Sequence, residues 1–186
     1  KYLHDHDDDI HPGLLCAFFP FSDLTIYDFN RVVQLPDLMS TTRFMAHLSM
    51  YFDISPAFIP TKPVKKHQLT LYINQEWYIL HWKESVLGLY NEKPMVLDVD
   101  LFNDVVLKTI LNISDIKSAN EIKYVEGICG LDGLMAASKN PSNAAFCLFA
   151  VTKEDLIFIS DAGGVLPPKS TWFEPRMKNA MIIKEF

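Results

Sequence analysis

The chain has 186 residues, 49% of them apolar and 22% charged, and a formal net charge of −6. This length suffices for one domain with a buried core, and no apolar run approaches the about 18 residues that span a bilayer. The acidic balance argues against a nucleic-acid partner, because phosphate backbones select basic faces. Three scattered cysteines, Cys16, Cys129 and Cys147, favour a reduced cytoplasmic setting over disulfides or a zinc knuckle.

The N-terminal segment, residues 1–13, is acidic and rich in histidine, with the run KYLHDHDDDIHP. Histidine and aspartate at close spacing can bind a divalent cation. A run with so few apolar residues gives such ligands no fixed geometry, so we interpret it as a flexible segment without a metal site. Because the chain begins with Lys1 and shows no signal peptide, we expect a fragment, produced by processing or truncation.

The domain over 14–186 opens with two apolar runs, 14–21 and 24–35, separated by Ser22-Asp23. This pattern predicts a hairpin of buried strands. Arg31 interrupts the second run. Its side chain either extends to the surface, the usual outcome, or projects into a pocket as a planar anion ligand.

A helix is predicted over 41–52, capped by Ser40 and carrying an apolar stripe at spacings of three and four residues. Prolines and lysines in 55–66 predict an extended surface connector. Residues 67–83 alternate in hydropathy around Asn74-Gln75, which predicts a second hairpin.

Candidate proton-transfer groups lie near these elements, and each has an ordinary structural explanation. His67 and His81 flank the second hairpin, where surface or packing roles are the better interpretation. Asp98 and Asp100 begin a predicted helix, where capping and the helix dipole account for both carboxylates.

The second half of the chain predicts further helices and strands. Thr152 to Asp155 resembles a capping box and Gly163-Gly164 a helix stop, so we predict a helix between them despite its isoleucines. The fold class is therefore α+β, a single domain with a mixed sheet, β-hairpins and about four helices. The remaining predictions are helices over 99–112, 131–139 and 153–161 and strands over 122–125, 144–151 and 180–186.

The densest functional segment is Asp161–Arg176, with the sequence DAGGVLPPKSTWFEPR. It is not a nucleotide phosphate loop, because Pro168 precedes the lysine where that loop needs glycine, and proline has no N–H to donate. One ammonium and two hydroxyls, on Lys169, Ser170 and Thr171, suit a phosphate or carboxylate, with Arg31 as a second cation. The alternative is a capped turn with a solvated lysine.

Four segments carry a family resemblance: YDFNRVV at 27–33, VLDVDLFNDVVLKTILNI at 96–113, YVEGICGLDGL at 124–134 and SDAGGVLPPKSTWFEPR at 160–176. Together they resemble the C-terminal part of the bacterial "domain of unknown function 1015" family. The resemblance covers 14–186. This chain departs from the family at Asn179-Ala180, where members carry a Ser-Gly pair.

The resemblance implies roles by position. It carries over Arg31, Lys169, Ser170 and Thr171, together with the family-motif residues Asp98, Asp161, Gly163 and Phe173. Full-length members have an N-terminal half with an ADGHHR motif that resembles the ParB-like free serine kinase fold, and this motif is absent here. The family's associations point to serine and phosphoserine metabolism.

Two functional hypotheses follow. The first is the C-terminal portion of a cytoplasmic phospho-ligand enzyme, a phosphotransferase or phosphatase, whose partners are a small phosphate-bearing or carboxylate molecule and its own N-terminal half. We expect the 186-residue chain to be inactive alone, because that half holds the proton-handling motif. The second is a non-catalytic structural or interaction domain in which the loop packs Trp172 and Phe173 against the sheet. No catalytic residue, cofactor or metal is assigned.

Overall fold

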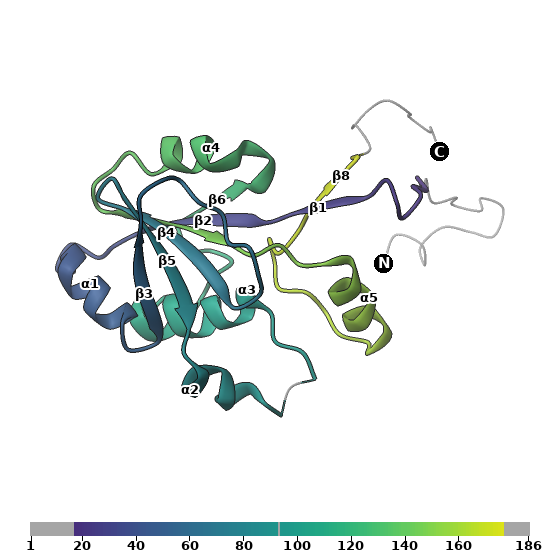
Figure 1. The fold of residues 1–186 in the computed structure, drawn as a ribbon, viewed down its shortest axis with the longest axis horizontal. Helices are drawn as coiled ribbons and strands as arrows, with labels where there is room; N and C mark the ends of the chain where they lie inside the picture. The colour runs from purple at the N-terminus through teal and green to yellow at the C-terminus, as the bar shows by residue number, and fades with distance from the viewer. Residues whose placement is uncertain (1–16, 93, 177–186) are drawn as a thin grey trace, which may run out of the picture. The chain divides into compact units, whose positions relative to one another are not determined.

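The computed structural model describes residues 17–92 and 94–176 (Figure 1). The larger of two compact units, Ile26–Trp172, holds the six-stranded sheet and the helices. The smaller unit comes from the two ends of the chain, and residues 17–25 and 173–176 of it are described. Strands β1 (Thr25–Tyr27) and β8 (Trp172–Glu174) form a separate two-stranded sheet.

The main sheet has the strand order β3-β5-β4-β7-β2-β6, and every neighbouring pair is antiparallel. One half of the sheet therefore contains the hairpin of β4 and β5, whereas in the other half β2 pairs with β6 and β7, which lie far from it in the sequence. β7 lies in the interior between β4 and β2, which explains its nearly continuous apolar sequence. The bounds are β2 Phe29–Gln34, β3 Phe52–Ala57, β4 Gln68–Ile73, β5 Glu76–Trp82, β6 Ile122–Glu126 and β7 Asn143–Leu148.

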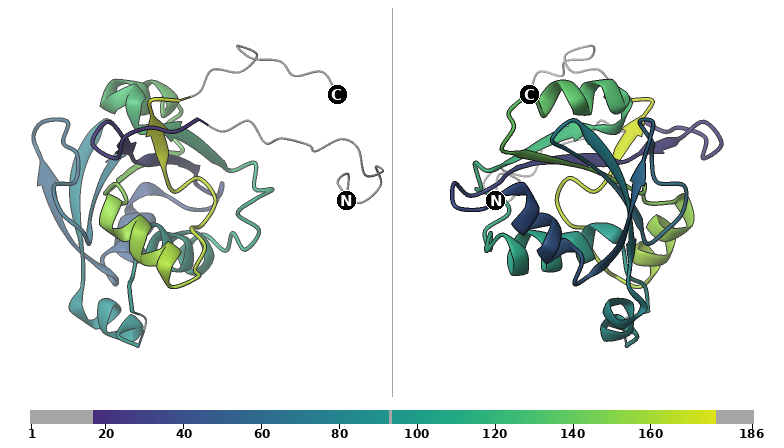
Figure 2. Two further views of the ribbon diagram at one scale, coloured as in Figure 1. Left: turned by 90° about the vertical axis from the view of Figure 1, so that its right-hand side faces the viewer. Right: turned by 60° about the vertical axis from the view of Figure 1, so that its left-hand side comes forward.

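Helices cover both faces of this sheet (Figure 2). One face packs against α1 (Thr41–Leu48) and α3 (Asp98–Leu101), which continues as the π-helix η3 (Phe102–Ile110). The opposite face packs against α4 (Gly130–Ala137). None of the helices in the described part of the chain has the length and apolar character that a membrane span requires.

Three aromatic rings form the centre of the core on the α1 side. Phe44, Phe102 and Phe146 are all fully buried. The Phe146 ring meets the Phe102 ring at 4.8 Å and the Phe44 ring at 6.3 Å, both edge to face. Such pairs add to the burial energy of each ring, so Phe146 joins β7 to two helices.

Helix α5 (Lys153–Asp161) has both ends defined by local sequence. Thr152 and Asp155 form the reciprocal capping box, with each side chain accepting from the other residue's backbone N–H at 3.1 Å. At the other end, Gly163 has φ 66°, and the N–H groups of Gly163 and Gly164 donate to Ser160 and Ile159. This is a Schellman motif, so these signals override the strand propensity of the isoleucines.

The start of β2 is fixed by a buried carboxylate, Asp28. Asp28 accepts a hydrogen bond from the Cys147 thiol at 3.5 Å and lies 3.7 Å from the Lys62 ammonium. Its carbonyl accepts from the N–H of Gly127, in the short helix η4 (Gly127–Cys129). A Cβ on Gly127 would lie 2.4 Å from Asp28 Oδ1, so only glycine fits this junction.

The α+β class and most elements are confirmed, including the hairpin at Asn74-Gln75, where both residues have positive φ. The strand predicted over 14–21 is wrong within the described residues, because 17–21 lie in a loop and turn. The helix predicted over 41–52 ends at Leu48, and Phe52 begins an unpredicted strand, β3, that takes part of the expected connector 55–66. The segment 1–13 and the strand over 180–186 lie outside the described residues.

The helix predicted over 99–112 is present, but most of it is the π-helix η3. The described residues hold five α-helices rather than about four, because the short α2 (Glu84–Leu87) was not predicted. The 3₁₀ turn η2 (Gly88–Tyr90) follows α2 directly.

Candidate functional site

A cavity lies where the C-terminal end of β7, the start of α3 and the start of α5 meet. We call it the Arg31 cavity. Its polar lining comes from segments far apart in the sequence: Arg31 of β2, Lys66 before β4, Asp98 of α3, Asp155 of α5 and Ser170. It is tight, with about 10 Å³ open to the centre of a water molecule, which is room for about one water.

Arg31 forms the deepest charge of this cavity, with 1% of its surface exposed. Two of its N–H groups donate to backbone carbonyls, those of Phe29 and of Lys169 at 3.1 Å. Its guanidinium also lies over the rings of Phe102 and Tyr124, 5.8 and 5.6 Å from their centroids. Burial lowers the pKa of Arg31 to about 10, so the group stays protonated at neutral pH.

No carboxylate of residues 17–92 and 94–176 forms a salt bridge with the guanidinium, and the charge of Asp28 acts on it only from beyond contact distance, raising its pKa against the effect of burial. Its Nε atom is buried without a hydrogen-bond partner there. Arginine has five N–H donors, and two of them are accounted for by the carbonyls. A buried cation with donors to spare is costly by itself, because desolvation is not offset by an ion pair.

The loop after α5 supports Arg31 mainly through its backbone. Lys169 has φ 56°, and its carbonyl, rather than its ammonium, contacts the guanidinium. The Lys169 ammonium lies 5.7 Å from the centre of the Phe29 ring. The Ser170 hydroxyl is buried and donates to the Pro167 carbonyl, which closes the loop on itself.

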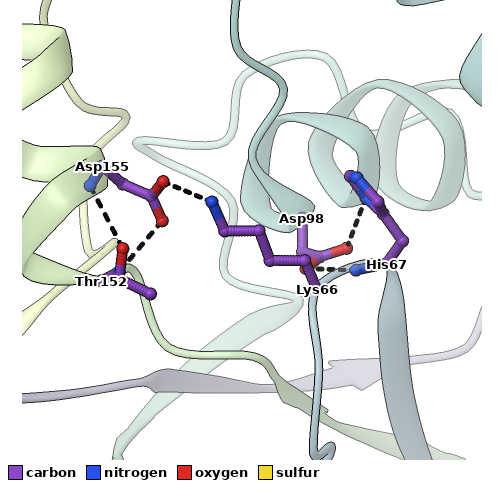
Figure 3. Close-up of polar contacts among 5 residues, drawn as sticks. All are labelled: Lys66, His67, Asp98, Thr152 and Asp155. Carbon is purple, nitrogen blue, oxygen red and sulfur yellow. Dashed lines mark hydrogen bonds and ion pairs between the residues drawn. The ribbon is translucent and has the colours of Figure 1, made fainter.

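Asp98 holds two residues from the second hairpin, Trp82 and His67, of which His67 is drawn in Figure 3. Its side chain is 4% exposed and accepts from the backbone N–H of His67 at 3.0 Å and from the Trp82 indole at 3.1 Å. The His67 Nδ1 atom lies 3.7 Å from Asp98 Oδ1, the distance of an ion pair rather than a hydrogen bond. His67 has φ 64°, a strained conformation for a residue with a side chain.

Lys66 reaches in the opposite direction, to Asp155 of α5 (Figure 3). The Asp155 side chain is 3% exposed, whereas that of Lys66 is 42% exposed, so the lysine enters from the surface. Burial raises the pKa of Asp155, but hydrogen bonds from Lys66 and Thr152 outweigh it and hold that pKa below its usual value. The consecutive residues Lys66 and His67 thus connect the start of the second hairpin to the first turns of α5 and α3.

The pairing of His67 with Asp98 predicts a pH-dependent stability. The nearby Asp98 carboxylate raises the pKa of His67 above its unfolded value, against the opposing effect of burial. The protonated imidazole is therefore favoured by folding, and its contribution is complete below about pH 6 and lost as the pH rises through the raised pKa. We expect His67→Asn to cost more unfolding free energy at about pH 5 than at about pH 8.5, measured by urea unfolding. Asparagine is chosen because it tolerates the positive φ of this position. Equal costs in unfolding free energy at both pH values would contradict the pairing of His67 with Asp98.

The structure brings together some of the predicted site residues. Arg31, Ser170 and the family-motif residue Asp98 line one cavity, and Arg31 is buried rather than extended to the surface. Lys169 is exposed and Thr171 half-buried, and neither side chain lines the cavity. Asp161 is exposed at the end of α5, Gly163 forms its Schellman turn, and Phe173 belongs to the smaller unit.

The interpretation of Asp98 as a helix cap is wrong. The cap position of α3 is Leu97, with no side-chain hydrogen bond, and the Asp98 carboxylate binds Trp82 and His67 instead. Lys66 and Asp155 were missed as cavity residues. The capping box signal for Asp155 is correct, but nothing in the sequence marks its second contact with Lys66.

The chemistry of this lining is that of charge recognition. Two cations and two carboxylates lie around the Arg31 cavity, and each carboxylate has partners of its own. Among the described residues no group of three His, Cys, Asp or Glu side chains could hold a metal ion. The fully buried group with unused donors is Arg31, whose planar fork suits phosphate or carboxylate oxygens.

Comparisons with known proteins place the chain in a family. Two mutants of free serine kinase, one in complex with AMP and one with ADP, are similar at 12% identity with TM-scores of 0.46 and 0.47. The similarity covers 82% of this chain, and the chain spans 55% of each kinase chain. No curated protein matches. Residues 4–102, more than half of the chain and ending before the loop at Asp161–Arg176, match the family described as protein of unknown function (DUF1015). The chain belongs to the DUF1015 family.

Proposed function

We propose that the Arg31 cavity, whose space for about one water widens when the partly exposed Lys66 side chain moves outward, binds an anionic group, the phosphate or carboxylate of a small molecule. The observation that carries the proposal is the fully buried guanidinium of Arg31, which forms no salt bridge with a carboxylate of the described residues and has a buried Nε with no hydrogen bond. A bound anion supplies acceptors for the unused N–H groups and a counter-charge in direct contact, which the Asp28 carboxylate does not provide. Charge-assisted hydrogen bonds to arginine are among the strongest in proteins.

The position of α5 supports the same proposal. Residues 148–151 lead from β7 to the helix cap at Thr152 and line the cavity, so the first turn of α5 lies beside it. The amino end of a helix carries a partial positive charge that favours anions. The Asp155 carboxylate in the capping box offsets part of this positive charge, and the guanidinium of Arg31 provides the remaining attraction for an anion.

The loop residues enter the proposal in two ways. Ser170 lines the cavity, but its single hydroxyl proton is donated to the Pro167 carbonyl, so it contacts an anion as a donor only after that hydroxyl rotates. Lys169 positions Arg31 through its carbonyl, and we propose its ammonium and the Thr171 hydroxyl as outer contacts of the ligand. For the full-length protein we propose a cytoplasmic phosphotransferase or phosphatase. In that protein the 186 residues supply anion binding, and the reacting groups come from another part of the chain.

Titration with inorganic phosphate and, separately, with acetate tests the proposal. We expect millimolar-range binding to the wild-type protein, and at least about a ten-fold loss in Arg31→Met, because one or two charge-assisted bonds are removed. Arg31→Lys should fall between them, since an ammonium cannot present a planar fork. Arg43→Met, an exposed arginine on α1, is the matched control and should bind like wild type. Isothermal titration calorimetry gives the affinities and thermal melts verify folding.

Two results would refute the anion site: no binding of either anion by folded wild-type protein, or equal affinity in folded Arg31→Met. A preference for phosphate or acetate identifies which anion the site takes. Low ionic strength is needed, because salt screens the partly exposed contacts.

A second candidate function is a structural lock formed by the loop. The Trp172 ring packs edge to face against Phe29 at 5.9 Å, which favours a packing role for this end of the loop. In that case Trp172→Ala should lower stability by about 1–3 kcal/mol without changing phosphate affinity. The anion proposal expects Lys169→Ala to weaken phosphate binding a few-fold with stability retained. Both variants belong in the same titration.

A further inference from the structure

We infer that Lys66 is the second anion-binding residue of the Arg31 cavity, with Asp155 as the counter-ion that holds it there. This inference rests on the proposed function of the cavity. Lys66 is the second cation inside the cavity, because it lines the same cavity as Arg31, whereas the Lys169 ammonium lies over Phe29 and is proposed only as an outer contact.

The geometry gives Lys66 the freedom that a ligand residue needs. Its side chain is 42% exposed and enters from the segment before β4, so the ammonium can adjust to a bound group. An ammonium has three N–H donors, and its contact with Asp155 Oδ1 uses one. The remaining donors are available to an anion without breaking the ion pair.

Asp155 does not depend on Lys66 for its role in α5. Its other carboxylate oxygen accepts from the Thr152 N–H at 3.1 Å, and its own N–H donates to the Thr152 hydroxyl. The capping box is therefore complete without the lysine. An asparagine at position 155 keeps an oxygen for the Thr152 N–H while removing the negative charge.

Charge balance indicates the direction of each substitution. The cavity carries Arg31 and Lys66 against Asp98 and Asp155, a formal sum of zero. Removing Lys66 leaves one cation against two carboxylates beside the anion, whereas removing the charge of Asp155 leaves two cations against Asp98 alone. We therefore expect Lys66→Met to weaken phosphate binding about ten-fold and Asp155→Asn to tighten it about three-fold or more. Lys65→Met, an exposed neighbour with the same charge change, is the control and should not alter affinity.

The double variant separates a ligand from a mere counter-ion. If Lys66 contacts the anion, Lys66→Met still weakens binding several-fold when introduced into Asp155→Asn. If Lys66 only neutralises Asp155, the double variant binds like Asp155→Asn alone, and the inference is overturned. Lys66→Arg should restore most of the lost affinity, and thermal melts verify that each protein is folded.

The outcomes also distinguish the two levels of the proposal. Phosphate binding that requires Arg31 but not Lys66 overturns this inference and leaves the proposed function intact. Absence of binding in folded wild-type protein overturns both. The proposed function and this inference are both supported if phosphate binding requires Arg31 and if Lys66→Met still weakens binding in the Asp155→Asn background.

Discussion

Replacing Phe146 with alanine should lower the free energy of unfolding by about 3–5 kcal/mol. The side chain is fully buried in the interior strand β7, and its ring contacts Phe44 and Phe102 from two different helical segments. Alanine removes both aromatic contacts and leaves a cavity that a six-stranded sheet cannot collapse to fill. Urea unfolding at a fixed pH measures the loss.

The same substitution should also affect the anion site. The Phe102 ring contacts both the Phe146 ring and the guanidinium of Arg31, so a looser Phe102 removes part of the surface beneath the cation. Phe58→Ala is the control, because that ring is 96% exposed, and a change within about 0.5 kcal/mol is expected. Equal stability losses for the two alanine variants would contradict the packing described for β7.

Replacing Gly127 with alanine should cost about 1–3 kcal/mol, because the new methyl group has no space. Its Cβ would lie 2.7 Å from the Asp28 carbonyl oxygen as well as 2.4 Å from its carboxylate. Neither atom can move freely: the carbonyl accepts from Gly127 itself, and the carboxylate is held by Cys147 and Lys62. The strand that carries Arg31 begins one residue later.

Gly88→Ala provides the matched control for this effect. Gly88 has helical backbone angles, φ −57° and ψ −26°, and a Cβ there would meet one side-chain atom at 3.9 Å. Alanine should therefore be neutral or stabilising by up to about 1 kcal/mol, since it restricts the unfolded chain. A loss at Gly88 as large as at Gly127 would contradict the explanation that the Asp28 contact determines the cost at Gly127.

Sequence patterns predicted those parts of the fold that are determined locally. The turn at Asn74-Gln75 and the capping box of α5 depend on residues within a few positions of one another. The errors occur where distant contacts decide. Phe52 fits the apolar stripe of a helix, but pairing with Trp82 on β5 draws it into β3.

The candidate site shows the same division. Arg31 was recognised as an unusual charge within a strand, yet its acceptors are two backbone carbonyls, which no side-chain pattern reveals. Asp98 lies at the start of a helix, where aspartate commonly caps, so the sequence offered no reason to expect its contacts with His67 and Trp82. Lys66 lies among ordinary surface lysines, and only the tertiary fold brings it to Asp155.

The hydrogen bond between Arg31 and Lys169 joins residues 138 positions apart, and this separation governs when the site can form. Both neighbours of β2 in the sheet, β6 and β7, follow it by about ninety residues or more, so loop closure must precede their pairing. Non-local contacts of this kind slow folding, and the loop that covers the guanidinium comes after them in the chain. Until that loop closes, Arg31 is a solvated surface charge rather than a preorganised ligand. Recovery of anion affinity during refolding would therefore report the last long-range contact, later than any signal from the hairpin of β4 and β5.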